Sequence, residues 1–273
     1  MRSWLIPFFS LALMTCTGTA SAHEFWTEAR PFSPKPGTQT HLFMYVGQYF
    51  EGVQVGYITT HTLMLKHYSV DALEDLITQV PAREAVGEIP VQIAHAGTHL
   101  IAFDSLPNPI TLSADKFEAY LHDEGLDHII RQREQDGASA APGRERFRRN
   151  TKTLLRAGRR SDATYAIRTH QRLELVPLND PLSTSPGAQL RFRLYFDDKP
   201  VPKALLRAWH HEGTETVSIR ATTDDNGDVS YVLPFAGSWM ISTVYMTPAP
   251  DTAEADWDSY WGSLMFEIPA RGR

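Results

Sequence analysis

The sequence is almost free of cysteine, and it has no long hydrophobic run beyond its first 22 residues. Its single cysteine, Cys16, lies in a leader segment that we expect to be removed, so the mature chain can form neither a disulfide nor a thiolate metal site. Any metal would have to be held by nitrogen and oxygen ligands. The apolar stretch at residues 5–14 is shorter than the about 20 residues that a membrane-spanning helix needs, so we expect no stable membrane insertion.

The sequence also lacks the short motifs of several enzyme classes. It contains no Gly-x-Ser-x-Gly elbow and no phosphate-binding glycine loop, and the mature chain has no catalytic cysteine. The formal net charge of −6 at pH 7 is mild for 273 residues and argues against nucleic acid as a partner. These absences favour a binding protein over an enzyme.

The N-terminus has the organisation of a secretory signal peptide at residues 1–22. Arg2 precedes the apolar stretch, and an Ala-Ser-Ala run at residues 20–22 provides a cleavage site. Cleavage there would make His23 the first residue of an exported chain, which we expect in the periplasm, where export without disulfides is common. A second interpretation of the leader is a lipoprotein cleavage box ending at Cys16.

The mature chain contains all 11 histidines, and imidazole is the commonest metal ligand in proteins. As the N-terminal residue, His23 would offer a free α-amine, with a reference pKa of about 7.7–8.0, in addition to its imidazole. His95 and His99 flank a predicted hairpin turn that could bring their imidazoles together. At most one of the adjacent residues His210 and His211 can face inward from a strand. We therefore expect the metal ligands among His23, His95, His99 and His210.

Other polar groups have structural interpretations. His61 and His67 lie six residues apart in a predicted strand, about 20 Å from each other, which is too far to share one ion. We interpret both as packing or surface residues. The basic stretch at residues 144–160 could bind phosphate or an acidic partner, or it could balance the acidic side chains of a neighbouring sheet.

Three regions are distinguished along the mature chain. Residues 23–112 contain short runs of β-formers separated by Pro and Gly, residues 113–160 have helical spacing, and residues 161–273 return to strand alternation. In the middle region we expect three helices, the last one at residues 144–157. The predicted fold class is mainly β, with two β-sandwich domains of the immunoglobulin-like or transthyretin-like type joined by a helical insert.

Several stretches of the chain, in matching order, resemble one family. They are Ala22-His23-Glu24-Phe25-Trp26, Gly97-Thr98-His99-Leu100-Ile101-Ala102, Phe117-Glu118-Ala119-Tyr120-Leu121, Glu124-Gly125-Leu126-Asp127, Arg144-Glu145-Arg146-Phe147, Leu173-Glu174-Leu175-Val176-Pro177-Leu178 and Trp257-Asp258-Ser259-Tyr260-Trp261. This family is a bacterial domain of unknown function that is often labelled a periplasmic component of nickel or cobalt uptake. The resemblance implies Ni²⁺ or Co²⁺ as ligand and a membrane metal transporter as partner, and among its motif residues His23 has an obvious chemical use.

Three functions remain open at this stage. The first is a non-enzymatic metal binder that holds Ni²⁺ or Co²⁺ at His23, although Cu²⁺ would bind the same nitrogens more tightly. The second is a copper-dependent oxygenase in which His23 and a second histidine form an N-terminal His brace. The third needs no metal: exposed Trp257, Tyr260 and Trp261 would contact a carbohydrate or a protein.

Overall fold

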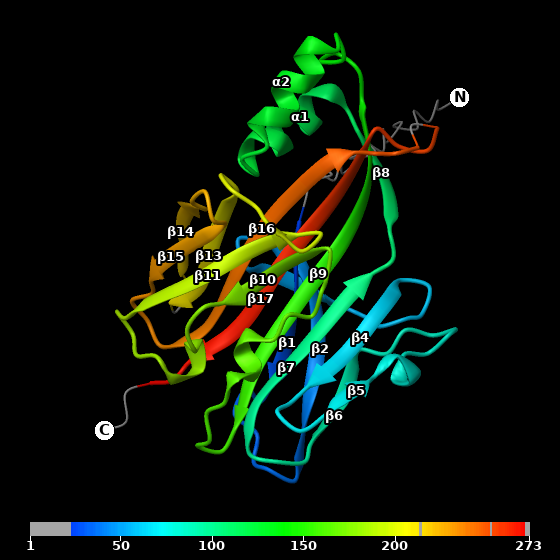
Figure 1. Cartoon of the computed structure of the whole chain (residues 1–273). Helices are drawn as coiled ribbons and strands as arrows, with labels where there is room; N and C mark the ends of the chain where they lie inside the picture. The colour runs from blue at the N-terminus through cyan, green and yellow to red at the C-terminus, as the bar shows by residue number, and fades with distance from the viewer. Residues whose placement is uncertain (1–22, 213–214, 252, 271–273) are drawn as a thin grey trace, which may run out of the picture.

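The structure, a computed structural model, describes residues 23–212, 215–251 and 253–270. The predicted signal peptide and Cys16 lie outside these residues. Three β-sheets are stacked in layers, and two helices lie at one end of the stack (Figure 1). The prediction of a mainly β protein is confirmed.

The central sheet has nine strands in the order β14-β13-β16-β17-β9-β7-β4-β5, with β8 paired to one end of β9. Their bounds are β4 Thr62–Tyr68, β5 Leu73–Asp75, β7 Gly97–Ser105, β8 Asn108–Leu112, β9 Gly143–Ala157, β13 Leu205–Glu212, β14 Glu215–Thr222, β16 Gly237–Pro248 and β17 Trp257–Ile268. Strands from both the N-terminal and the C-terminal half of the chain therefore belong to one sheet.

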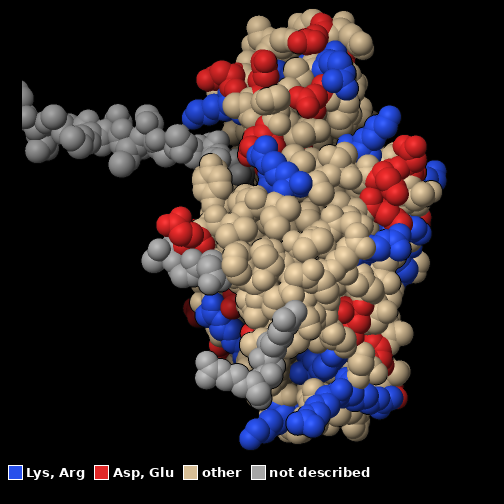
Figure 2. Space-filling model, turned by 90° about the vertical axis from the view of Figure 1, so that its left-hand side faces the viewer, with Lys and Arg blue, Asp and Glu red and all other residues tan. Residues whose placement is uncertain are grey.

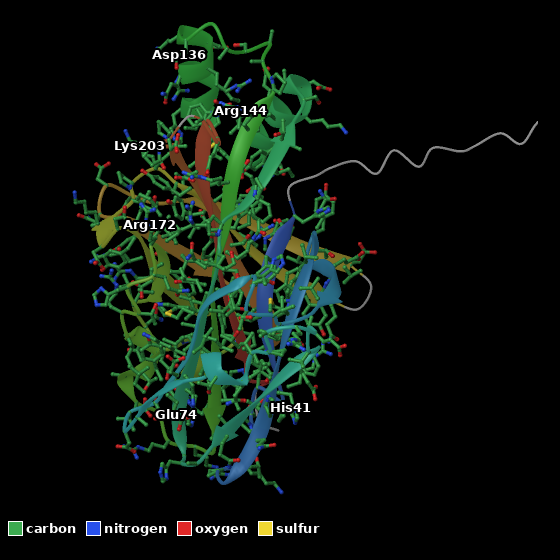
Figure 3. The ribbon with its side chains drawn as sticks, turned by 90° about the vertical axis from the view of Figure 1, so that its right-hand side faces the viewer. His41, Glu74, Asp136, Arg144, Arg172 and Lys203 are labelled. Carbon is green, nitrogen blue, oxygen red and sulfur yellow. The ribbon has the colours of Figure 1, made fainter. Side chains whose placement is uncertain are left out.

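Two smaller sheets of four strands each cover the central sheet. The N-terminal outer sheet consists of β1 Glu24–Arg30, β2 Thr38–Gln48, β3 Glu51–Val55 and β6 Glu88–Ile93. The C-terminal outer sheet consists of β10 Leu173–Pro177, β11 Gln189–Phe196, β12 Lys199–Pro200 and β15 Asp228–Val232. Figure 3 shows this stack from one edge, with His41 on β2 and Glu74 on β5 labelled.

The middle strands of the central sheet, β7, β9, β16 and β17, are buried on both faces along most of their length, because one outer sheet packs on each face, whereas the edge strands β5 and β14 are largely exposed. Successive side chains of a strand point to opposite faces. Ile101 of β7 and Leu155 of β9 accordingly join the core under the N-terminal outer sheet. Their neighbours Leu100 and Leu154 join the second core, under the C-terminal outer sheet. One sheet thus serves as a wall of two hydrophobic cores.

The helix predicted at residues 144–157 is wrong, because this segment forms strand β9. Its Thr153 hydroxyl lies 2.8 Å from the Thr27 hydroxyl of the N-terminal outer sheet, while Leu154 faces the opposite core. A strand that is buried on both faces shows no alternation of apolar and polar residues. The adjacent Leu154 and Leu155 therefore suited a helix as well as a strand.

The basic side chains of β9 form ion pairs with acidic residues near and within the neighbouring strand β17. Arg144 pairs with Asp256 at 2.7 Å, and Arg146 and Arg148 both approach the carboxylate of Asp258 at 2.9 Å. This ladder supports the structural interpretation of the basic stretch, since these guanidinium groups already have carboxylate partners.

β9 joins the two halves of the chain. It pairs in parallel with β17, from Glu145 opposite Trp257 to Thr153 opposite Met265, and it pairs antiparallel with β7 on its other side. The nine-stranded sheet is therefore continuous across the boundaries at 112 and 161 that were predicted to separate two sandwich domains. Residues 113–160, which were expected to form a helical connector, thus contribute β9, the strand that joins the two halves of the sheet.

Helices α1 Ala114–Asp123 and α2 Asp127–Gln135 agree with the first two helices predicted from the sequence. They form a cap over one end of β16 and β17, in which Phe117 and Tyr120 pack with Trp257 and Trp261 in a third hydrophobic cluster (Figure 1). Trp257, Tyr260 and Trp261 are 5%, 1% and 6% exposed. An exposed aromatic binding surface at these residues is therefore excluded.

Charged side chains are unevenly distributed over the face of the molecule shown in Figure 2. Figure 2 shows acidic and basic side chains mixed over the helical cap, above a largely uncharged area at the centre of this face. Within the described residues, neither helix has the length and apolar character required to cross a membrane.

Candidate functional site

The candidate site begins at His23, which immediately precedes β1. The main chain here is held in place, because Arg149 donates a hydrogen bond from Nη1 to the His23 carbonyl oxygen at 2.8 Å. The Nδ1 atom of His23 is buried and has no hydrogen-bond partner among the described residues. Burial, followed by the nearby Arg149 cation, lowers the pKa of the imidazole. His23 is therefore mainly neutral at pH 7, which is the form that binds metal ions.

Arg149 is itself a buried cation enclosed by aromatic rings. Its guanidinium carbon lies 4.6 Å from the ring centre of Trp261, 4.9 Å from that of Phe147 and 5.6 Å from that of Phe25. Burial lowers its pKa to about 10, so that the side chain stays charged at pH 7. The ring faces and the His23 carbonyl partly replace the water that this charge has lost.

A pair of buried carboxylates lies beside this arrangement. Glu24 of β1 and Glu124, at the end of α1, line one small internal cavity together with Ser242 and Trp261. Burial, followed by repulsion from Glu124, raises the pKa of Glu24 to about 7. Glu124 accepts a hydrogen bond from Arg207 of β13 and so has a counter-charge. Glu24 is thus poised between its neutral and charged forms near neutral pH.

These groups come from stretches that are remote in the sequence. His23 immediately precedes β1 and Glu24 begins it, Glu124 caps the end of α1, Arg149 lies on β9 and Trp261 lies on β17. Four of the five belong to stretches on which the family resemblance was based. An imidazole, two carboxylates and two buried guanidinium groups are thereby concentrated at one end of the stack, beneath the helical cap.

His99 is placed differently from the expectation. Its Nδ1 lies 2.9 Å from Nε2 of His67 on the adjacent strand β4, and its Nε2 lies 3.1 Å from the carbonyl oxygen of His95. The hairpin turn brings the His95 main chain to His99, and no contact between their imidazoles is present among the described residues. His67 Nδ1 lies 3.2 Å from Glu74, which completes a chain of polar contacts. Burial lowers the pKa of both His67 and His99.

His210 occupies a third environment. Its ring stacks on Trp239 at 4.6 Å and on Phe235 at 5.4 Å, and its Nδ1 donates to the Ser238 carbonyl oxygen at 2.8 Å. The adjacent His211 donates from Nε2 to the carbonyl oxygen of Phe50 at 2.7 Å. His210 and His211 both line an open pocket of about 640 Å³, whose wall also includes Trp26 and Tyr45 of the N-terminal outer sheet.

The four histidines predicted as metal ligands therefore do not form one cluster. His23 contacts Arg149 through its carbonyl oxygen, His99 contacts His67 and the carbonyl oxygen of His95, and His210 lies between aromatic rings. Within residues 23–212, 215–251 and 253–270, no group of three or more His, Cys, Asp or Glu side chains is arranged to hold a metal ion. A metal at His23 would depend on the α-amine as a second nitrogen ligand.

A family profile described as a domain of unknown function, DUF4198, matches residues 20–247 of the chain. The chain belongs to this family. The matched region contains His23, Glu24, Glu124, Arg149 and the His67–His99 pair. The description of the family names no activity, so membership of the family does not show nickel or cobalt uptake.

Other comparisons add little to this assignment. No curated protein matches the chain. A mutant of Salmonella alpha-2-macroglobulin has 10% identity and a TM-score of 0.23 over 90% of this chain and 16% of its own. The three N-terminal domains of the bacteriophage RB49 highly immunogenic outer capsid protein have 11% identity and a TM-score of 0.17 over 89% of this chain and 59% of their own. The chain thus spans less than two thirds of either structure, and these TM-scores are too low to support an argument.

Sequence reasoning missed several of the polar groups described above. His67 was interpreted as a packing residue, and Glu24, Glu124 and Arg149 received no role of their own. The Arg149 guanidinium meets His23 across 126 residues of sequence, and His67 meets His99 across 32. One available signal was the presence of Glu24 and Glu124 within the stretches that resemble the family.

Proposed function

We propose that the exported chain is a periplasmic metal-binding protein that takes up Ni²⁺ or Co²⁺ at the mature N-terminus and passes it to a membrane metal transporter. The observation that carries this proposal is the buried Nδ1 of His23, which has no partner among the described residues. A buried nitrogen without a hydrogen bond is costly, and a ligand that pairs with it removes that cost.

The chemistry of His23 fits such a ligand. After cleavage at Ala22, the α-amine and Nδ1 of His23 would close a six-membered ring with one metal ion. Ni²⁺ and Co²⁺ accept nitrogen ligands of this kind, and Cu²⁺ would bind them more tightly. Arg149 holds the His23 carbonyl, so the main chain of the chelating residue is already ordered before binding.

A site with two protein nitrogens leaves further coordination positions open. Water or a ligand from a partner would occupy them, which suits a metal that is cargo and must be released to a transporter. A structural metal site would instead be closed by four protein ligands. The absence of a third convergent ligand among the described residues is therefore compatible with delivery.

The alternative of a copper-dependent oxygenase has less support. A His brace needs a second imidazole beside His23, whereas His99 pairs with His67 and His210 stacks on Trp239. Among the described residues, no histidine ring contact with His23 is present. We therefore favour a non-enzymatic role.

The deciding experiment is a calorimetric titration of Ni²⁺ and Co²⁺ into three proteins. The first starts at His23, the second retains Ala22 in front of it, and the third carries His23→Gln at its N-terminus. We expect the first to bind at micromolar concentrations, and the extended protein to lose at least tenfold in affinity, about 1.4 kcal/mol, because its α-amine is blocked.

Two outcomes would overturn the proposal. Equal binding by the first and the extended protein would place the metal elsewhere, and a matched His210→Gln variant would then test the second pocket. No binding by any of the proteins would remove the metal function altogether. His99→Gln serves as a control that leaves the N-terminus unchanged.

A further inference from the structure

A second cavity, which Arg149 lines, has the properties of a ligand site. It has a volume of about 420 Å³ and lies between β2 and β3 of the N-terminal outer sheet and β7 and β9 of the central sheet. This volume is within the range of about 300–1,000 Å³ that is typical of small-molecule pockets. The apolar walls are formed by Phe25, Met44, Val46, Val55, Phe103 and Phe147.

The cavity contains one cation, Arg149. Its guanidinium packs against Phe25 and Phe147, two residues of the cavity wall. Among the residues that the structure describes, its only hydrogen bond from the guanidinium goes to the His23 carbonyl oxygen, and it forms no ion pair. Buried guanidinium groups are normally matched by a carboxylate or phosphate, often through two parallel hydrogen bonds. The remaining donors of Arg149 are suited to an anion in the cavity.

The apolar wall continues from the cavity to the surface. In the β2–β3 hairpin, Met44 pairs with Val55 and Val46 pairs with Val53, so these four side chains share one face. Val53 is 68% exposed. An apolar strip therefore leads from the solvent to the region of Arg149, as a chain with a charged head would require.

We propose that this cavity binds a small amphipathic anion, an alkyl carboxylate whose head pairs with Arg149 and whose chain packs against Phe25, Phe103 and Val55. Arg149 is itself only 8% exposed, and the low dielectric constant around a buried guanidinium strengthens its pairing with a carboxylate head group. Among the described residues Arg149 has no direct ion pair and is attracted to the buried carboxylates of Glu145, Glu24 and Glu124 only at longer range, so the ligand would add a carboxylate in direct contact with it. This inference does not require a metal at His23.

The test uses decanoate and, as a neutral match of the same length, decanol. Both are titrated by calorimetry into the metal-free protein that retains Ala22, in which the proposed chelate at His23 is blocked. Three variants are compared with it: Arg149→Met removes the charge, Val55→Trp fills the cavity, and Val232→Trp adds the same bulk at an exposed position of β15 on the far side of the central sheet.

We expect the unmodified protein to bind decanoate. Arg149→Met should lower the affinity for decanoate at least tenfold and leave the affinity for decanol unchanged. Val55→Trp should lower the affinity for both ligands. Val232→Trp should bind like the unmodified protein. The inference is overturned if decanoate does not bind, if Val55→Trp leaves its affinity unchanged, or if decanoate and decanol lose affinity equally in a folded Arg149→Met. If Arg149→Met fails to fold, Val55→Trp decides by itself.

Co-sedimentation of the protein with phosphatidylglycerol vesicles distinguishes binding of a free ligand from binding to a lipid surface. Co-sedimentation without any binding of decanoate would also overturn the inference. Metal titration in the Val55→Trp protein starting at His23 keeps the two proposals separate. Metal binding there together with lost decanoate binding would show that the two sites act independently.

Discussion

The buried ion pair between Lys152 of β9 and Glu174 of β10 connects the central sheet to the C-terminal outer sheet. Lys152 Nζ lies 2.6 Å from Glu174 Oε1, and both side chains are almost fully buried. Glu174 also accepts from Arg168 Nε at 2.7 Å and from the main-chain nitrogen of Thr169 at 2.5 Å. Burial opposes ionisation of Glu174, but Lys152 and these hydrogen bonds hold its pKa below the usual value.

We expect Glu174→Leu to lower the free energy of unfolding by about 3–5 kcal/mol, because it leaves the Lys152 ammonium buried without a counter-charge. Lys152→Met should cost less, since Glu174 keeps Arg168 and Thr169 as partners. The double variant should be more stable than Glu174→Leu alone, because no lysine charge then remains buried at this position.

Urea unfolding of the four proteins, followed by circular dichroism, measures these differences. The control is Asp197→Asn, which breaks a half-exposed ion pair with Arg172 that spans 2.7 Å. Such pairs contribute about 0.2–1 kcal/mol. The reasoning would be refuted if Glu174→Leu lowered the free energy of unfolding no more than this control does. It would also be refuted if the loss in the double variant equalled the sum of the losses in the two single variants.

Two further predictions concern the histidine pair and the helical cap. Burial lowers the pKa of His67 and His99 below the usual value of 6.5 in the folded protein. As the pH decreases below 6.5, the unfolded chain therefore binds more protons than the folded protein, and the free energy of unfolding should fall. In the double variant His67→Gln, His99→Gln, the free energy of unfolding should depend less on pH between about pH 7 and 5. The same pH dependence as in the unmodified protein would contradict this. A Cβ at Gly143 would lie 2.2 Å from the buried Phe117 ring. Gly143→Ala should therefore cost about 1–3 kcal/mol in thermal unfolding, and an unchanged Tm would contradict the packing.

Much of the secondary structure could be predicted from local patterns. In β11, Leu190, Phe192 and Leu194 are buried and alternate with more exposed residues, as the period of two indicated. In α1, Phe117 and Tyr120 fall on the buried face, as the helical spacing indicated. Both elements have one buried and one exposed face, so their exposure pattern repeats with the geometry of the backbone.

β9 was beyond the reach of such patterns. Both of its faces are buried along much of its length, and Lys152 meets its partner Glu174 inside the protein. The burial pattern of a strand between two sheets depends on which sheets cover it. That information lies in segments far away in the sequence, so the local pattern allowed a helix.

The sequence by itself determined the mainly β character and the position of the two helices. That cleavage makes His23 an N-terminal metal chelator is a prediction from the sequence. Only the tertiary structure decided that one central sheet spans both halves of the chain and that Arg149 holds His23. Local elements follow from the chemistry of neighbouring residues along the chain. The site depends on contacts across up to 126 residues, which arise only when the sheets pack.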